Sequence, residues 1–209
     1  MDYLQQLNKR YPELESLNED ILSAFNILVQ TFSNGGKLLV AGNGGSASDS
    51  LHITGELMKG FVKKRPLPEN FKITLNNIYP EHSMYLCSSI QQGLPTISLP
   101  SEISLISACI NDIDGEIIYA QQVYGYGNEN DAFLGISTSG NSKNIMYAMV
   151  TAKAKNMKTI ALIGGNGGIL KNYADVSIIV PENETYKIQE LHLPIYHSLC
   201  LMLEEHFFP

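Results

Sequence analysis

Cysteine is scarce in this chain of 209 residues. The three cysteines, Cys87, Cys109 and Cys200, are odd in number and lie far apart. Because no CxxC pair is present, the sequence indicates neither a disulfide framework nor a zinc ribbon. We therefore expect reduced thiols and a cytoplasmic protein.

Positive charge and long apolar runs are also lacking. The chain has 14 lysine and arginine residues against 21 aspartate and glutamate residues, so its net charge is −7. An acidic surface disfavours nucleic acid and anionic membranes as partners, although a local cationic pocket for a small anion is compatible with it. No apolar run reaches the ~18–20 residues of a membrane span, and the first residues show no signal-peptide core. We expect neither a nucleic-acid nor a membrane partner.

Apolar residues, at 44% against 17% charged, are plentiful enough for one folded domain over residues 1–209. A helical segment is predicted over about residues 1–34, with an amphipathic helix from Leu14 to Phe32. Short apolar runs then alternate with helical patterns, at residues 37–42, 132–136, 159–163 and 176–180. This alternation predicts an α/β fold with a mainly parallel sheet, in which ligands bind at the carboxyl ends of the strands.

Two stretches depart from this alternation. Residues 64–100 contain five prolines, so we expect an extended excursion there with a short helix around residues 83–91. A long closing helix is predicted from Thr185 to Phe207, but Pro194 lies inside it. Because proline lacks the backbone N–H, we expect the helix to kink or restart at that point.

The first loop of interest, Gly42–Ser48, has the sequence GNGGSAS and joins a predicted strand to a predicted helix. Free amides and the helix dipole near Ser46 favour an anion. The loop also fits the dinucleotide pattern G-x-G-x-x-A, which requires an acidic strand end about 20 residues further on. Residues 60–65 stand there instead, with the basic sequence GFVKKR, so a dinucleotide is disfavoured. A plain strand-to-helix turn remains open for this loop alone.

The second loop, Ser137–Ser142, has the sequence STSGNS and also follows a predicted strand. It lacks the lysine of a nucleotide P-loop. Its four hydroxyls, together with helix-terminal amides, are suited to a phosphate monoester. Helix capping is the plainer explanation, but four hydroxyls in six residues exceed what capping needs. If the two loops follow neighbouring strands, they converge on one ligand.

Acid–base and metal candidates lie on two predicted helices. His52 and Glu56 are four residues apart and so share one helix face. The closing helix carries Gln189, Glu190, His192 and His197. Imidazole, carboxylate and amide groups can together hold a divalent metal such as zinc. For each histidine alone a structural role is the plainer interpretation, and we assign His82 and His206 no other.

Three segments together resemble the SIS (sugar isomerase) domain family, and within it the phosphoheptose isomerase branch. They are GNGGSASDSLHITGEL at residues 42–57, GISTSGNS at 135–142 and IQELH at 188–192, followed by His197. The resemblance covers about residues 22–205 apart from one segment. It implies a three-layer sandwich, in which a mainly parallel five-stranded sheet is flanked by helices. It also implies a homotetramer assembled through the N-terminal helices, with active sites at subunit interfaces.

The resemblance further implies an enzyme that isomerises a phosphosugar between aldose and ketose through an enediol. The implied pair is sedoheptulose 7-phosphate and D-glycero-D-manno-heptose 7-phosphate. One Zn²⁺ per subunit is implied, bound by His52, Glu56, Gln189 and His197, and Glu56 and His197 match the acid–base pair. The implied substrate contacts are Asn43, Ser46, Asp112, Ser137, Thr138, Ser139, Ser142 and Gln189.

Three features depart from the family pattern and leave the exact sugar open. Gly60 stands where an arginine often follows Glu-Leu, and Tyr186 stands where an acidic residue usually precedes the IQE motif. Residues 67–92 look like an insertion, which we expect to form a lid or an intersubunit contact near the active site. The alternative function is a non-catalytic phosphosugar-binding or replication-initiator-associating regulatory protein. The presence of both Glu56 and His197 favours the enzyme.

Overall fold

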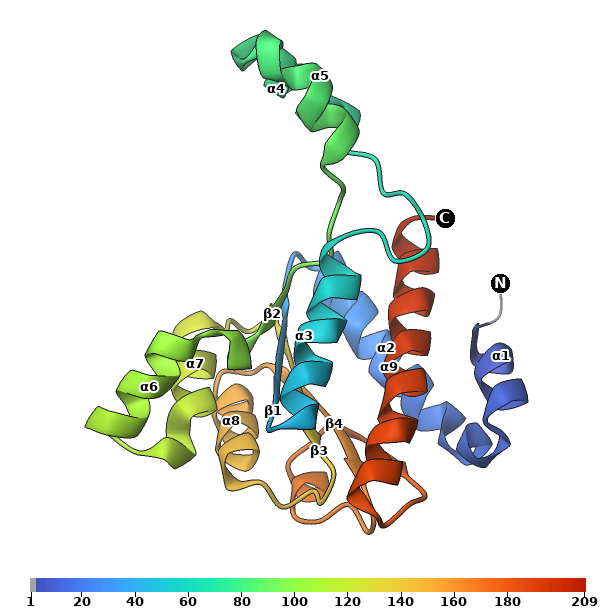
Figure 1. The fold of residues 1–209 in the computed structure, drawn as a ribbon, viewed down its shortest axis with the longest axis vertical. Helices are drawn as coiled ribbons and strands as arrows, with labels where there is room; N and C mark the ends of the chain where they lie inside the picture. The colour runs from blue at the N-terminus through green and yellow to red at the C-terminus, as the bar shows by residue number, and fades with distance from the viewer. Residues whose placement is uncertain (1–2) are drawn as a thin grey trace.

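A five-stranded parallel sheet lies at the centre of the computed structural model, which describes residues 3–209 (Figure 1). Its strand order is β2-β1-β3-β4-β5, and every pair of neighbours is parallel. The strands are β1 (Leu38–Gly42), β2 (Thr96–Ser98), β3 (Ala132–Ser137), β4 (Lys158–Gly164) and β5 (Val176–Val180). Apolar runs predict four of them. The strand β2 has only three residues and lies in the proline-rich stretch, so it leaves no such signal.

Helices cover both faces of the sheet, which confirms the three-layer α/β sandwich (Figure 1). Strand residues alternate between two apolar cores, since Leu38 and Val40 pack in one and Leu39 and Ala41 in the other. The first face carries α1 (Tyr3–Arg10), α2 (Asn18–Ser33), α3 (Gly45–Met58) and α9 (Thr185–Phe207). The second face carries α6 (Ile103–Asp112), α7 (Ile118–Tyr126) and α8 (Lys143–Ala154).

The prediction of one helix from Leu14 to Phe32 is wrong about where the α-helix begins. A 3₁₀-helix, Pro12–Leu17, comes first, and α2 begins only at Asn18. The Asn18 N–H donates to the carbonyl of Glu15, three residues back, which is the tighter winding of a 3₁₀ turn. This winding still buries Leu14 and Leu17, the first two residues of the apolar periodicity.

The helix α9 does not restart at Pro194, in contrast to that part of the sequence prediction. It runs from Thr185 to Phe207 as one element, with Pro194 buried inside it. Proline removes the hydrogen bond to the carbonyl four residues back, which belongs to Glu190. Glu190 is exposed to solvent, and buried apolar residues on both sides of Pro194 hold the helix against the sheet.

Residues 69–89 form a helical hairpin that stands away from the sheet (Figure 1). It consists of α4 (Glu69–Ile78) and α5 (Pro80–Ser89), where the sequence predicts only one short helix. An antiparallel bridge between Pro66 and Gln91 closes its base. Within residues 3–209, no helix combines the length and apolarity needed to cross a bilayer.

Candidate functional site

The first loop turns sharply between β1 and α3. Gly44 adopts a positive φ of 56°, and the Ser46 amide donates to the carbonyl of Asn43 at 3.0 Å. Ser46 is buried at the first turn of α3. A Cβ added to Gly45 would lie 2.5 Å from Nε2 of Gln189, so this glycine lets the α9 side chain lie directly on the loop backbone.

The second loop lies beside the first, because β1 and β3 are neighbours in the sheet. The amide groups of Asn43 and Asn144 exchange two hydrogen bonds of 2.9 Å, which tie the first loop to the start of α8. Within the second loop, Oγ of Ser137 and Oγ of Ser142 lie 2.9 Å apart. The structure thus brings the two loops together, as the sequence predicts.

Two cavities flank the hydroxyls of the second loop. One, of about 290 Å³, is lined by Thr138, Ser139, Gly164, Gly165, Asn166, Asn183, Thr185 and Ile188. The other, of about 490 Å³, is lined by Asn43, Asp114, Gly115, Glu116, Ser142, Lys143 and Asn144. Asp112 does not line the second cavity. It ends α6, and its Oδ1 accepts from Nδ2 of Asn111 at 2.7 Å.

A cluster of acid–base groups forms where α3 packs against α9. Nε2 of His52 lies 3.1 Å from Oε1 of Glu56, and the rings of His52 and His197 meet edge to face with centroids 4.9 Å apart. Two atoms of the cluster are buried and have no hydrogen-bond partner among residues 3–209, namely Oε2 of Glu56 and Nε2 of His197. Nζ of Lys59 lies 3.7 Å from this Glu56 oxygen, beyond hydrogen-bond distance, so both atoms keep the capacity to accept a bond from a ligand.

Asp49 and Tyr196, which the sequence analysis does not single out, extend this cluster. The Tyr196 hydroxyl donates to Oδ1 of Asp49 at 3.2 Å and lies 3.0 Å from Nδ1 of His52. With its proton directed to Asp49, the hydroxyl accepts from His52 Nδ1–H, a tautomer inferred from the network. The bond between His52 Nε2 and Glu56 then needs one further proton, carried by one of these two residues. The only signal in the sequence is that Asp49 stands three residues before His52.

Burial sets the charge state at the edge of this cluster. It lowers the pKa of His197, and nearby His52 lowers that pKa further, while Glu56 offsets part of the effect. Burial also raises the pKa of Asp49, against the hydrogen bond from Tyr196. Burial and the neighbouring Asp49 raise the pKa of Tyr196. His197 is therefore neutral at neutral pH, and its Nε2 is able to act as a base or a ligand.

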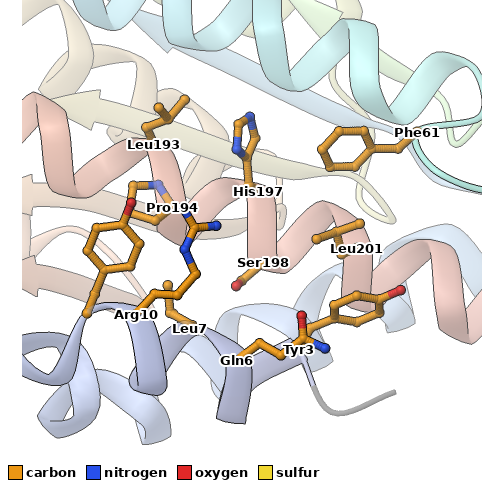
Figure 2. A pocket seen from close by; sticks show the side chains of 11 residues that line it. Tyr3, Gln6, Leu7, Arg10, Phe61, Leu193, Pro194, His197, Ser198 and Leu201 are labelled. Carbon is orange, nitrogen blue, oxygen red and sulfur yellow. The ribbon is translucent and has the colours of Figure 1, made fainter.

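His197 is among the residues that line a cavity of about 340 Å³ between α1 and α9 (Figure 2). Its lining mixes apolar surface with a few polar groups, from Tyr3, Gln6, Leu7, Arg10, Tyr11, Phe61, Leu193, Pro194, His197, Ser198 and Leu201. The Phe61 ring lies 5.5 Å from the His197 ring, centroid to centroid. The cavity is large enough for a small polyhydroxylated chain and places it next to the acid–base cluster.

The four predicted metal ligands are only partly gathered. His52, Glu56 and His197 lie together, whereas Gln189 precedes His197 by eight residues, about 12 Å of helix, and lies against Gly45. Among residues 3–209 no group of three or more His, Cys, Asp or Glu side chains is arranged to hold a metal ion. The donor types nevertheless suit zinc, and the unpartnered Oε2 of Glu56 and Nε2 of His197 are the atoms that a metal would use.

The fold and this site define a sugar-phosphate protein of the SIS type. A family model described as "SIS domain" matches residues 2–88 and 91–164, so the chain belongs to the SIS domain family. The relatives found among curated proteins are enzymes. The chain is 39% identical to the phosphoheptose isomerase of Helicobacter pylori over 194 residues, which are 93% of this chain and 88% of the relative. It is 37% identical to the phosphoheptose isomerase of Leptospira biflexa over 195 residues, with the same two coverages.

Solved structures give the same result. The phosphoheptose isomerase of Francisella tularensis superposes with a TM-score of 0.75 at 32% identity, covering 97% of this chain and 95% of that one. The phosphoheptose isomerase of Neisseria gonorrhoeae superposes with a TM-score of 0.75 at 28% identity, covering 96% of this chain and 94% of that one. The similarity thus extends over nearly the whole chain.

Proposed function

We propose that this chain is a phosphoheptose isomerase that interconverts sedoheptulose 7-phosphate and D-glycero-D-manno-heptose 7-phosphate. One observation carries the proposal: His52, Glu56 and His197 meet where α3 packs against α9, and α3 itself begins within the first loop. The identity of 39% to a named phosphoheptose isomerase over most of the chain supports it. A non-catalytic binding protein has no need of this acid–base cluster.

The phosphate group of the sugar would bind at the two loops. Hydroxyls and helix-terminal amides bind a phosphate monoester without a P-loop lysine. The proposed contacts at this end are Asn43, Ser46, Ser137, Thr138, Ser139, Ser142 and Gln189. The side chains of Gln189 and Asn43 lie on the loops themselves, which supports their place in the set. Asp112 is retained as a predicted contact to the substrate.

Glu56 and His197 would carry out the proton transfers. Isomerisation removes a proton from the carbon next to the carbonyl and returns it to the former carbonyl carbon, while the hydroxyl proton moves between the two oxygens. With no metal bound, Oε2 of Glu56 would take the carbon proton and the neutral Nε2 of His197 the oxygen proton. A zinc ion on these same two atoms would compete with both transfers. His52 and Tyr196 hold Glu56 in place through their chain of hydrogen bonds to Asp49.

We also propose one zinc ion per subunit, with His52, Glu56, Gln189 and His197 as its ligands. Bound by these residues, zinc would supply a Lewis acid for the sugar carbonyl and for the negative charge of the enediolate. The two unpartnered donor atoms support this site. Metal analysis of the purified protein and of a His52→Ala variant tests it independently of activity. Equal zinc content in both would refute these ligands.

The remaining parts of the proposal concern assembly and location. We propose a homotetramer in which the N-terminal helices contribute to the subunit contacts, within a single SIS domain that carries residues 67–92 as an insertion. The cavity between α1 and α9 makes the N-terminal segment part of the wall beside His197, which supports a role for it near the site. All three cysteines are free, which supports the cytoplasm as the compartment.

Turnover of sedoheptulose 7-phosphate, followed by NMR with and without a chelator, tests the proposed function. We expect the aldose product to form, and the rate to fall with the chelator and return with added zinc. A protein that binds phosphosugars but converts none of them would instead be the non-catalytic regulatory alternative.

A further inference from the structure

The hairpin of α4 and α5 exposes an unusual amount of apolar surface. Six large side chains between residues 69 and 89 are between 48% and 86% exposed: Phe71, Ile73, Ile78, Tyr79, Met84 and Tyr85. Ser83 is the only buried residue of the two helices. Surface of this kind, concentrated on one projecting element, marks an interaction site.

These two helices lack what an isolated hairpin needs for stability. Each has ten residues, and helices shorter than about 12–15 residues are marginal in water without packing. Neither helix buries an apolar side chain among residues 3–209. The hairpin also stands away from the sheet and its covering helices (Figure 1). We therefore expect the apolar surface of the two helices to be covered by another protein surface, which stabilises them.

The base of the hairpin is fixed, so the hairpin projects in one direction. Arg65 is fully buried and its Nε donates to Oε1 of Glu204 at 2.8 Å. Nη1 of Arg65 donates to the carbonyl of Leu57 at 2.7 Å, which attaches the base to the end of α3. The amide of Gln92 donates to the carbonyl of Arg65 at 2.8 Å. This bond joins the segment that enters the hairpin to the segment that leaves it. A partner would therefore meet the hairpin in a defined orientation.

We propose that the α4–α5 hairpin binds the same hairpin of a second copy of this chain across a two-fold axis, forming a four-helix arrangement. A segment that cannot fold alone needs a partner that is present whenever the chain is made, and another copy always is. The same patch meets itself in such an isologous contact. Packing of two helical hairpins buries apolar stripes in the way that four-helix bundles do.

Charge and area both fit this pairing. The charged residues of the hairpin are Glu69, Lys72 and Glu81, and Glu69 and Lys72 already pair with each other at 3.2 Å. Like-charge repulsion between two copies is therefore small, and no strongly charged patch calls for a partner of opposite sign. The six exposed side chains offer an area on the order of the ~800 Å² that each partner of a standard interface buries.

A groove between the two helices gives this contact a place to interlock. It has a volume of about 450 Å³, and its lining combines Ile73, Met84 and Cys87 with the polar side chains of Glu69, Lys72, Asn76, Asn77 and Ser83. Tyr85 is 73% exposed and immediately follows Met84, so the hairpin presents a large ring beside its own groove. Two copies related by a two-fold axis would each be able to insert this ring into the groove of the other.

The pair of substitutions Met84→Glu and Tyr85→Glu tests the proposal, because it places two charges on the most exposed apolar side chains of the hairpin. Light scattering should show wild-type particles that contain at least two chains of 23.1 kDa. The double variant should have half that mass or less. Hydrogen exchange at residues 69–89 should be slow in the wild type and fast in the variant. Neither readout depends on the proposed enzymatic function.

The control keeps the apolar surface with Met84→Leu and Tyr85→Phe, and should assemble as the wild type does. Circular dichroism of both variants checks that the sheet and its helices stay folded. The proposal is wrong if the Glu variant keeps the wild-type mass, or if the wild type is a monomer. It is equally wrong if residues 69–89 exchange fast within the wild-type assembly.

Discussion

Tyr196 is the residue on which the order of the acid–base cluster depends. Its hydroxyl is the one group that connects Asp49 to His52, at 3.2 Å and 3.0 Å. Tyr196→Phe removes the hydroxyl and leaves a buried ring of nearly the same shape. We expect kcat to fall about 10- to 100-fold, the usual effect of removing a group that orients a catalytic or metal-binding side chain. Steady-state kinetics should show little change in KM, because the phosphate loops are untouched.

His192 provides a pH test that is independent of the site. It is fully buried, and burial lowers its pKa to about 4, an effect that the neighbouring backbone of Ile163 offsets only in part. The unfolded chain takes up the proton near pH 6.5, whereas the folded chain does so only near pH 4. Stability is therefore complete above pH 6.5 and is lost as the pH falls toward 4.

We predict that this single histidine lowers the free energy of unfolding by about 2 kcal/mol between pH 7 and pH 5. Urea denaturation at the two pH values measures this difference, and His192→Leu should reduce it by that amount. An unchanged difference in the variant would mean that His192 is protonated equally in both states. His206→Leu is the matched control, because His206 lies on the same helix and is more exposed.

At the scale of elements, the two loops after β1 and β3 make the phosphate site, and the second loop can be tested by itself. Ser139→Ala and Ser142→Ala each remove one hydroxyl without touching the acid–base cluster. A hydrogen bond to a charged group contributes about 1.5–3 kcal/mol. We expect the double variant to bind sedoheptulose 7-phosphate at least tenfold more weakly in calorimetry. Ser23→Ala, at an exposed position on α2 away from both loops, is the control; if the double variant binds as this control does, the phosphate lies elsewhere.

The connection between α3 and the hairpin depends on a buried ion pair. The Glu204 carboxylate accepts from Arg65 and from the amides of Phe61, Val62 and Lys63. Arg65→Met leaves this buried carboxylate without its counter-charge, which costs about 3–5 kcal/mol in such cases. We expect a loss of that size in chemical denaturation.

Replacing the partner as well separates the charge from the packing. Arg65→Met combined with Glu204→Leu removes both charges, and pairs replaced in this way lose far less stability. The double variant should be more stable than Arg65→Met alone. If Arg65→Met is as stable as the wild type, the ion pair does not anchor the connection.

At the scale of the whole molecule, the sequence predicts the layers better than the contacts between helices. Parallel strands that are buried on both faces appear in the sequence as continuous apolar runs. The four runs at residues 37–42, 132–136, 159–163 and 176–180 predict four of the five strands of the sheet. The pairing of Tyr196 with His52 depends on how α3 and α9 are rotated against each other, which no periodicity in either helix specifies. Residue types and the family resemblance together single out His52, Glu56 and His197, and the packing of α3 against α9 brings the three side chains together.

The hairpin shows where sequence reasoning fails at this scale. The sequence predicts an excursion over about residues 67–92, and the helices cover residues 69–89. Its apolar residues form no stripe that faces the sheet, and none of them is buried in this chain. Periodicity analysis assumes that apolar residues face the core of their own chain, so it detects only one of the two helices.

The central claim is that Glu56 moves a proton between neighbouring carbons of a phosphosugar. Incubation of sedoheptulose 7-phosphate in D₂O, followed by NMR, tests it most directly, because an enediol exchanges its carbon-bound proton with solvent. We predict that the wild type places deuterium on the carbons that exchange the carbonyl. Glu56→Gln should do so more slowly by a factor of about 100 or more, with zinc content measured alongside. The control His206→Asn should match the wild type. Deuterium incorporation by Glu56→Gln at the wild-type rate would contradict the account.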